Sequence, residues 1–145
     1  MRRIKTLLAA AGIAAVAATA PIALAASGTP TLKLKSTNLG KILTSKGDTM
    51  FAFTRDKPNM DKCQSIKRCT GTWRPLVTKR KPMAGSGVHA SLIGTIKLKN
   101  GKKQVTYNKH PLYIYSVFPK GTSYVDFKQF GGRWDALKAS GKPVN

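Results

Sequence analysis

The chain has 145 residues, a formal net charge of +21, five aspartates and no glutamate. So few carboxylates leave little basis for paired-acid glycoside hydrolysis, and no phosphate loop, nucleophile elbow or H-E-x-x-H motif is present. These observations argue against an enzyme. The lysine excess predicts either attraction to polyanions or simply high solubility.

Residues 1–25 are typical of a secretory signal peptide. The basic start "MRRIK" precedes an Ala-rich apolar stretch, and small residues predict cleavage after Ala25, with Ala26 as the near alternative. The other interpretation, a membrane anchor, needs about 20 unbroken apolar residues, and Pro21 interrupts this stretch. We therefore expect an exported protein. It has no cysteine near the cleavage site that could carry a lipid anchor.

Removal of this segment leaves 120 residues, enough for one compact domain, which we expect over residues 39–145. No later segment is apolar enough to cross a membrane. Residues 26–38 form a polar leader, in which Leu32 and Leu34 alternate with lysines. That alternation fits either an edge strand or a tether.

Cleavage also removes three of the 26 cations, so the net charge falls from +21 to +18. Of the 23 cations that remain, 18 are lysines. Lysine is a strongly hydrated point charge and lacks the geometric readout of arginine. We therefore expect diffuse, salt-sensitive association with anionic material rather than recognition of a specific nucleic acid.

The first regular segment is an expected hairpin, with strands over Ile42–Ser45 and Thr49–Thr54 around the turn "KGD". On the second strand, Phe51 and Phe53 share one face, and Met50 lies on the other face together with the residues two and four positions after it. This alternation predicts a strand whose aromatic face is buried.

Residues 57–87 predict a long irregular excursion, rich in proline and glycine. Cys63 and Cys69 belong to an exported chain, so we expect them to form a disulfide. The alternative, a zinc or haem attachment, does not match the C-x5-C spacing. Trp73 is expected to pack this excursion onto the sheet.

A second hairpin follows. Ile96 and Leu98 alternate with lysines ahead of Asn100-Gly101, a strong hairpin signal because both residues tolerate positive φ. The return strand passes through Tyr107, "NKHP" turns the chain again, and Leu112–Phe118 predicts a third strand. In the tail, aromatic residues around Gly131-Gly132 predict a bend and a short closing strand or turn.

Two groups of cations are candidate binding residues. The hairpin lysines are expected to fall opposite the apolar positions and to crowd one solvent-facing side, and a basic loop precedes them. The set is Lys79, Arg80, Lys81, Lys97, Lys99, Lys102 and Lys103.

The two halves of the chain show a faint duplication. "FAF", with Phe51 and Phe53, and "YIY", with Tyr113 and Tyr115, each follow a turn and place two rings on one strand face. We expect two related β-hairpin units, over about 40–78 and 94–136. The fold class is therefore a small all-β domain, packed as a compact sheet or sandwich, with a long disulfide-stapled loop between the units.

These motifs resemble a bacterial secreted-repeat family of unknown function, predicted exported proteins and lipoproteins with a Y-x-(F/W/Y)-x-x-D motif. "FAFTRD" matches with Phe for the leading Tyr, "YIYSVF" lacks the Asp, and "WRPL" after the cysteines resembles W-P-P-L. The stretch "GSGVHASLIGTIKLKNGKKQVTYNKHPLY" is the most specific part of the match. The matching positions are Phe51, Phe53, Asp56, Trp73, Pro75, His110, Pro111, Tyr113 and Tyr115.

The resemblance implies a β-rich exported domain without an established biochemical role. The absence of a lipid-attachment cysteine favours a freely secreted, periplasmic or extracellular form. Asp56, which closes the first motif, is expected to cap a turn or to pair with Arg55 or a nearby lysine.

The residues favour a non-catalytic protein that associates with anionic envelope or extracellular polymers and holds no cofactor. The alternative is an exported redox, metal or haem accessory protein that uses His110 with His89, Cys69 or Met83. A structural envelope protein without a soluble ligand is a third possibility. The sheet aromatics fit either a stacking platform for single-stranded nucleic acid or sugars or, more simply, the core.

Overall fold

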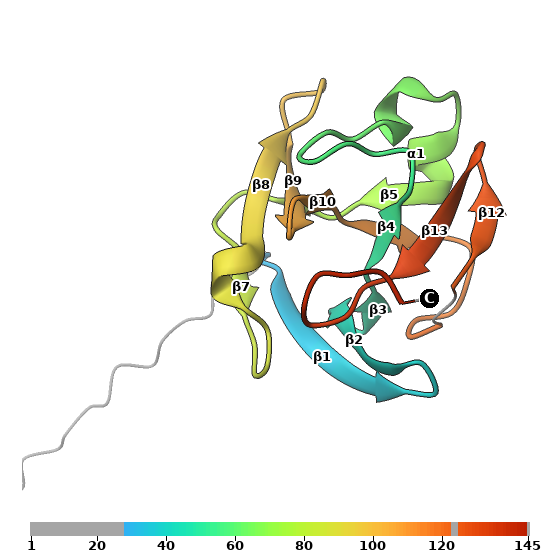
Figure 1. Cartoon of the computed structure of the whole chain (residues 1–145). Helices are drawn as coiled ribbons and strands as arrows, with labels where there is room; N and C mark the ends of the chain where they lie inside the picture. Colours follow the sequence, from blue (N-terminus) through green and yellow to red (C-terminus); the bar gives the residue numbers. More distant parts are fainter. Residues whose placement is uncertain (1–27, 123–124, 145) are drawn as a thin grey trace, which may run out of the picture.

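Figure 1 shows the computed structural model, which describes residues 28–122 and 125–144. It is an all-β domain, as predicted, in which three sheets pack together. The first sheet orders β3 (Asp48–Thr49), β2 (Gly40–Ser45), β1 (Thr31–Thr37) and β7 (Met83–Ala84). The second orders β10 (His110–Pro111), β9 (Lys103–Tyr107) and β6 (Val77–Thr78), with β8 (Ile93–Lys97) also on β9. The third orders β12 (Phe127–Gln129), β13 (Gly132–Ala136), β4 (Phe51–Phe53), β11 (Tyr113–Tyr115) and β5 (Trp73–Pro75).

The predicted signal peptide and its cleavage position lie outside the described residues. In the leader, the strand alternative is correct. β1 pairs with β2 at six positions from Leu32 to Thr37, and the Leu32 side chain is fully buried. β1 is not a free edge throughout, because its first two residues also pair with β7. Within the described part of the chain, no helix is long and apolar enough to cross a bilayer.

Three hairpins close through two-residue turns with both residues at positive φ, the geometry that matches the twist of the flanking strands. The turns are Lys46-Gly47, Asn108-Lys109 and Phe130-Gly131. The first corresponds to the predicted "KGD" turn, the second to "NKHP" and the third to the predicted bend in the tail. The turns predicted at the first two places are confirmed, and in the tail the bend is confirmed and the closing-strand alternative is correct.

The hairpin at Asn100-Gly101 forms as predicted, but its turn is different. Only Gly101 has positive φ, at 81°. Its N–H donates to Leu98 O at 3.0 Å, and the Leu98 N–H donates to Lys102 O at 2.8 Å. This is a three-residue loop in which a β-turn is followed by a glycine bulge. Only Gly101 uses the tolerance for positive φ that favoured this hairpin, because the loop is one residue longer than the dipeptide alone requires.

β4 is a central strand, buried on both faces. Phe51 and Phe53 belong to the core cluster that contains both tryptophans, whereas Met50 and Ala52 belong to the second core cluster. The predicted alternation is therefore confirmed, with one addition. The face opposite the rings is also buried, because residues of both the first and the second sheet pack against it.

β4 and β11 are reached by the same path. β3 passes into β4 through Met50, whose N–H donates to Leu43 O at 2.9 Å. β10 passes into β11 through Leu112, whose N–H donates to Val105 O at 3.0 Å. The two strands then pair antiparallel. The expected strand over 112–118 is therefore shorter and lies in a different sheet from the hairpin before it.

β4 and β11, the strands that carry the paired aromatic residues, each pair with a strand that contains a tryptophan and is distant in the sequence. β13 pairs with β4, and β5 pairs with β11. The rings of Trp73 and Trp134 stack between them, with centroids 4.0 Å apart and an interplanar angle of 3°. The units expected over 40–78 and 94–136 stay a prediction. These pairings hold their two halves in one core.

The segment 57–87 is more regular than predicted. It contains the short helices η1 (Cys63–Ser65) and α1 (Cys69–Thr72) and the strands β5, β6 and β7. The helix η2 (Ala90–Leu92) follows the segment. The predicted disulfide between Cys63 and Cys69 is present and buried. Irregular composition concealed these strands because each has only two or three residues, too few for a visible alternation.

Candidate polyanion-binding groove

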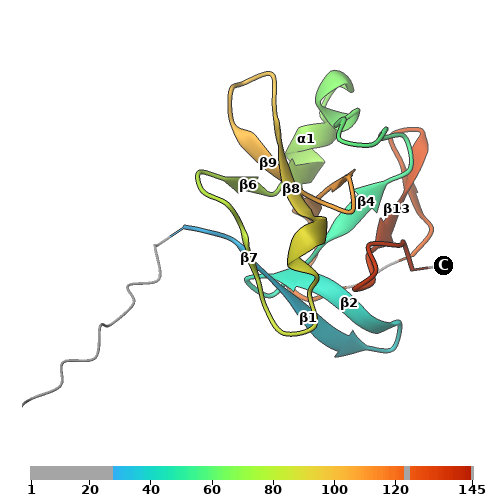
Figure 2. The ribbon, with the colours of Figure 1, turned by 60° about the vertical axis from the view of Figure 1, so that its left-hand side comes forward.

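The structure brings most of the candidate cations together, although they come from separate parts of the sequence. Figure 2 shows β6 and the loop after it on the same side of the molecule as the β8–β9 hairpin. β6 pairs antiparallel with β9, which places Thr78 opposite Lys103. The loop over residues 79–82 therefore begins beside the basic end of β9.

Two hollows adjoin at this place, and we call them together the basic groove. The larger has a volume of about 850 Å³ and is lined by Gly28, Thr29, Val77, Thr78, Lys79, Arg80, Gly101, Lys102 and Lys103. The smaller, of about 310 Å³, is lined by Lys79, Arg80, Lys81, Pro82, Ile93, Gly94, Thr95 and Lys103. Because Lys79, Arg80 and Lys103 line both hollows, they separate one from the other.

A short hydrogen-bonded turn shapes the loop between the hollows. The Thr78 hydroxyl donates to Arg80 O at 2.5 Å and accepts the Arg80 N–H at 3.2 Å. The Thr78 side chain is buried, so this turn is shielded from water. It holds the backbone of the loop in one conformation while the cationic side chains stay exposed.

Contrary to the sequence prediction, the hairpin lysines do not all lie on one solvent-facing side of the β8–β9 hairpin. β8 and β9 pair with Lys97 opposite Lys103 and Thr95 opposite Val105. Lys103 therefore shares its strand face with Val105 and Tyr107, both fully buried. For Lys103, the prediction that the lysine lies opposite the apolar positions is therefore wrong, whereas Lys97 alternates with Ile96 and Leu98 as predicted. The hairpin lysines are exposed because they gather at the turn end of the hairpin, beyond the part that the core covers.

Lys99 is held away from the groove by the disulfide loop. Its N–H donates to Gln64 Oε1 at 2.9 Å, and its ammonium donates to Ser65 Oγ at 3.0 Å. Both partners belong to η1, next to the buried disulfide. Lys97 lies opposite Lys103 but lines neither hollow. Five of the seven candidate cations therefore border the groove.

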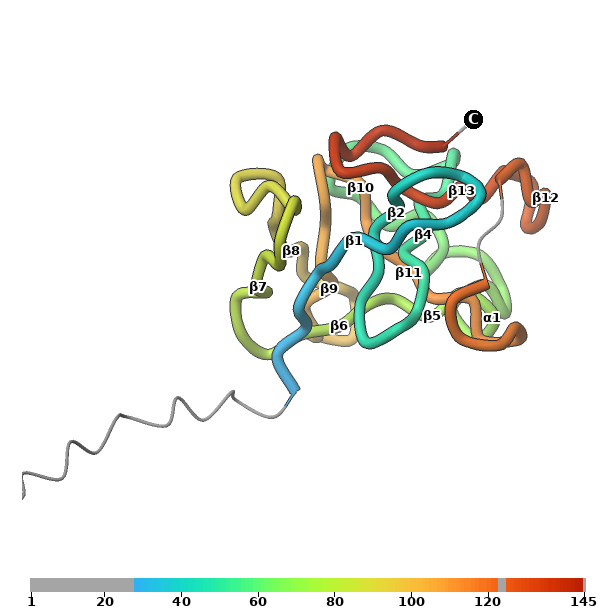
Figure 3. Tube along the Cα trace, turned by 90° about the horizontal axis from the view of Figure 1, so that it is seen from below, coloured from blue at the N-terminus to red at the C-terminus, as the bar shows by residue number. Residues whose placement is uncertain are grey.

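The groove carries uncompensated positive charge. Of the described residues that line the two hollows, none is acidic. Over residues 28–122 and 125–144, the three ion pairs all use Asp126 or Asp135, with Lys128 and Arg133 on the β12–β13 hairpin. Figure 3 shows β12 on the opposite side of the molecule from β6, β8 and β9. No carboxylate of the described residues therefore lies within ion-pairing range of the groove cations.

A second titratable cluster lies beside the disulfide. Asp56 accepts the Tyr113 hydroxyl at 2.9 Å and the Lys62 N–H at 2.7 Å. It does not pair with Arg55, whose guanidinium donates to Phe130 O. Burial raises the pKa of the Asp56 carboxyl to about 7, and the neighbouring Asp61 charge adds to the shift while both hydrogen bonds oppose it.

Tyr113 is fully buried, and its pKa is raised by burial and by the two nearby carboxylates. Asp61 is 3% exposed; its Oδ1 accepts the Gln64 N–H, whereas its Oδ2 has no hydrogen-bond partner. The motif aspartate thus ties the disulfide loop to β11 from the other half of the chain. The sequence alone did not predict this pair of residues.

The histidines do not form a cluster with other ligands. Among the described residues, no group of three or more His, Cys, Asp or Glu side chains is placed to hold a metal ion. His110 is half-buried in β10, and burial lowers its pKa. His89 is exposed, and its N–H donates to the Tyr107 hydroxyl at 3.0 Å. The metal or haem alternative stays a prediction without a supporting contact.

The aromatic side chains belong mainly to the core. Phe51, Phe53, Tyr107 and Tyr113 are all buried, and Tyr115 is half-buried against Trp73 at a centroid distance of 4.3 Å. The stacking-platform alternative for these rings is wrong. The core alternative is correct.

The sequence did not predict several of the residues that line the groove. Val77, 42% exposed, contributes an apolar wall, and Thr78 fixes the loop. Gly28 and Thr29 come from the leader, more than 40 residues before β6. Only the alternation of Val77 with buried Leu76 and Thr78 hinted at a strand here, and two residues are too short a signal.

Comparisons with known protein families, with characterised proteins and with solved structures find no match to this chain.

Proposed function

We propose that this protein is an exported, non-catalytic protein that associates with anionic polymers of the cell envelope or the extracellular space through the basic groove. One observation carries the proposal: five cations from two separate segments border two adjoining hollows whose lining contains no acidic residue. The cations are Lys79, Arg80, Lys81, Lys102 and Lys103.

The mechanism is electrostatic. A polyanion in solution holds condensed counterions, and it releases them when protein cations neutralise its charges. With five contacts, the logarithm of the binding constant should fall with the logarithm of the salt concentration with a slope of about −3.5 to −4.5. Four of the five cations are lysines, which favour charge attraction over a fixed bidentate geometry.

Export is the second part of the proposal. It is supported by the signal-like residues 1–25 and by the buried disulfide, since such bonds persist in oxidising compartments. Membership of the secreted-repeat family is proposed on the motif positions alone. The hydrogen bond between motif residues Asp56 and Tyr113 is compatible with it.

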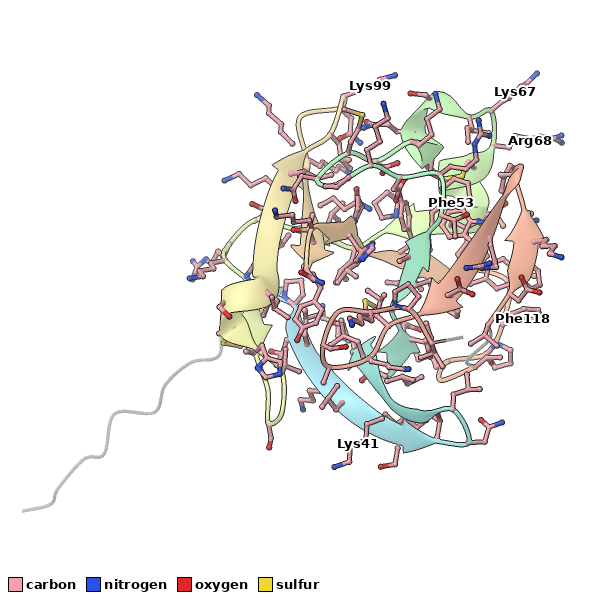
Figure 4. The ribbon with its side chains drawn as sticks, in the orientation of Figure 1. Lys41, Phe53, Lys67, Arg68, Lys99 and Phe118 are labelled. Carbon is pink, nitrogen blue, oxygen red and sulfur yellow. A yellow bond between two sulfur atoms is a disulfide. The ribbon has the colours of Figure 1, made fainter. Side chains whose placement is uncertain are left out.

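The test compares two variants with equal charge. The groove variant replaces Lys79, Arg80, Lys102 and Lys103 with Gln. The control variant replaces Lys41, Lys67, Arg68 and Lys128 with Gln, and all four of these are exposed. Figure 4 shows Lys41 at the far end of the molecule from Lys99, and Lys67 and Arg68 beside α1. Each variant loses three lysines and one arginine.

The measurement is retention of each protein on isolated cell-envelope polymers over a salt titration. The groove variant should bind at least about tenfold more weakly at low salt, and its salt slope should be smaller by about 3. The control variant should stay close to the wild type. Equal losses in the two variants would show that net charge, not the groove, causes the retention.

A further inference from the structure

We infer that the basic groove takes a single extended anionic chain, rather than a flat anionic surface such as a bilayer. The inference rests on the proposed function and deepens it. Its basis is the division of the groove into two hollows on either side of one basic loop.

The positions of the shared cations carry the first step. Lys79, Arg80 and Lys103 line both hollows, whereas Lys102 lines only the larger one and Lys81 only the smaller one. A ligand that meets all five cations must therefore occupy both hollows and pass over the loop between them. A flexible chain can follow this path, but a flat surface meets only the most prominent side chains.

The remaining lining carries the second step. Two glycines, Gly28 and Gly101, line the larger hollow, and a Cβ at either position would meet open space. With no side chain at these positions, a narrow polymer can approach the backbone closely. Val77, partly exposed in the larger hollow, offers an apolar contact for the uncharged part of a polymer unit. These features suit a chain with spaced charges.

Rigidity carries the third step. The Thr78 hydroxyl closes the loop onto Arg80, the β6–β9 pairing fixes where the loop begins, and the glycine bulge fixes the hairpin end. A groove that is already formed does not lose backbone entropy when the ligand binds. The ordered loop therefore favours a ligand that adapts its own shape to the protein.

The experiment uses two probes of the same phosphate chemistry. The first is linear polyphosphate of defined chain length, and the second is vesicles of phosphatidylglycerol in phosphatidylcholine. Binding of the wild type, the groove variant and the control variant is measured at one low salt concentration. Affinity per chain should rise with length and then level off near roughly five to ten phosphates, about twice the number of groove cations at most.

The groove variant should bind the longer polyphosphates at least about tenfold more weakly than the wild type, with the control variant unchanged. Vesicle binding should be weaker per accessible phosphate, and both variants should reduce it to a similar extent. Vesicle binding that is as strong per phosphate, and reduced by the groove variant alone, would overturn the single-chain inference while the proposed function stands. Binding of neither probe, or equal polyphosphate losses in both variants, would overturn the proposed function itself.

A second pair of variants tests the path between the hollows. Lys81→Gln alters only the smaller hollow and Lys102→Gln only the larger one. Each should weaken the binding of a long polyphosphate about two- to fivefold. With tripolyphosphate, too short to occupy both hollows, the two substitutions should not both weaken binding. Equal effects of both substitutions on the short and long probes would contradict a chain that spans the two hollows.

Discussion

Two places in the molecule share one backbone arrangement, and one of them is the basic groove. At the groove, β9 pairs with Val77 of β6, and the Val105 N–H donates to Leu76 O at 2.8 Å. At the other corner, β2 forms a bridge to Lys138, and the Leu43 N–H donates to Leu137 O at 2.8 Å.

The chains leave these corners differently. After Thr78 the chain runs on towards β7 and leaves the hollows open. After Leu137 it turns back on itself, because the Lys138 N–H donates to Lys142 O at 2.9 Å and the Gly141 N–H donates to Lys138 O at 2.9 Å. The Tyr107 hydroxyl holds this returning loop through Ala139 O at 2.6 Å.

The comparison shows that strand pairing alone does not make the candidate site. Lys41, next to the bridge residue Ile42 of β2, occupies the position at the β2 corner that Lys103, next to a paired residue of β9, occupies at the groove. Both are exposed lysines at the start of a strand. What differs is the loop that faces them.

The largest effect is expected from the stacked tryptophans that join the units. Trp134→Ala should lower the free energy of unfolding by about 3–5 kcal/mol, because it leaves a cavity between Phe53 and Trp73. Trp73→Ala should cost a similar amount if the two strands play equivalent roles. Denaturant unfolding measures both. A loss below 1 kcal/mol for either variant would contradict the shared core.

Asp56 distinguishes the first unit from the second, because the second unit has Phe118 at the corresponding position after its aromatic pair. The Asp56 carboxyl should make the stability of the protein depend on pH. The folded-state pKa is about 7 and the unfolded value about 3.8, so the folded protein retains a proton that the unfolded chain releases. Its stabilising contribution is complete below about pH 4 and is lost as the pH rises through 7. After discounting for partial exposure, the loss is about 2–3 kcal/mol.

The measurement is the free energy of unfolding from pH 4 to pH 8 for the wild type and Asp56→Asn. The substitution removes this titration and leaves the other titrating groups, including His110, in place. As the pH rises from 4 to 8, the free energy of unfolding of the wild type should therefore fall by more than that of Asp56→Asn. Parallel profiles would mean that the carboxyl titrates near its ordinary pKa.

The disulfide loop belongs to one unit only. Replacing Cys63 and Cys69 with Ser should lower the free energy of unfolding by about 2 kcal/mol, because the closed loop is short. Since η1 holds Lys99, the β8–β9 hairpin end should also become more mobile. Amide hydrogen exchange at Lys99 measures this, with the Lys46-Gly47 hairpin as the internal reference. Unchanged protection at Lys99 would show that the loop does not hold the hairpin.

The smallest effect is expected from the corresponding lysines. Lys103→Gln should weaken polyanion binding about three- to tenfold at low salt, roughly 1 kcal/mol by the tenfold-per-1.4 kcal/mol conversion. Lys41→Gln should change it less than twofold. Both variants lose one charge and should unfold like the wild type. If the two substitutions weaken binding equally, the hollow contributes nothing beyond net charge.

The sequence by itself was sufficient for the local features. Glycine and asparagine at Gly47, Gly101 and Asn108 predicted turns because they adopt positive φ at low cost, and alternation around Phe51 and Phe53 predicted a strand with a buried aromatic face. The disulfide followed from two cysteines in a chain expected to be exported. These signals are contained within a few neighbouring residues.

Tertiary structure alone decided which distant segments meet. β5 and β6 have two or three residues each, so their identity as strands depends on partners from β9 and β11 that close large loops of chain. The cations at 79–81 and 102–103 border one groove because Thr78 pairs with Lys103, whereas at the β2 corner the chain turns back after Leu137. The sequence determines how many cations the protein carries, but the groove that brings five of them together depends on pairing between distant strands.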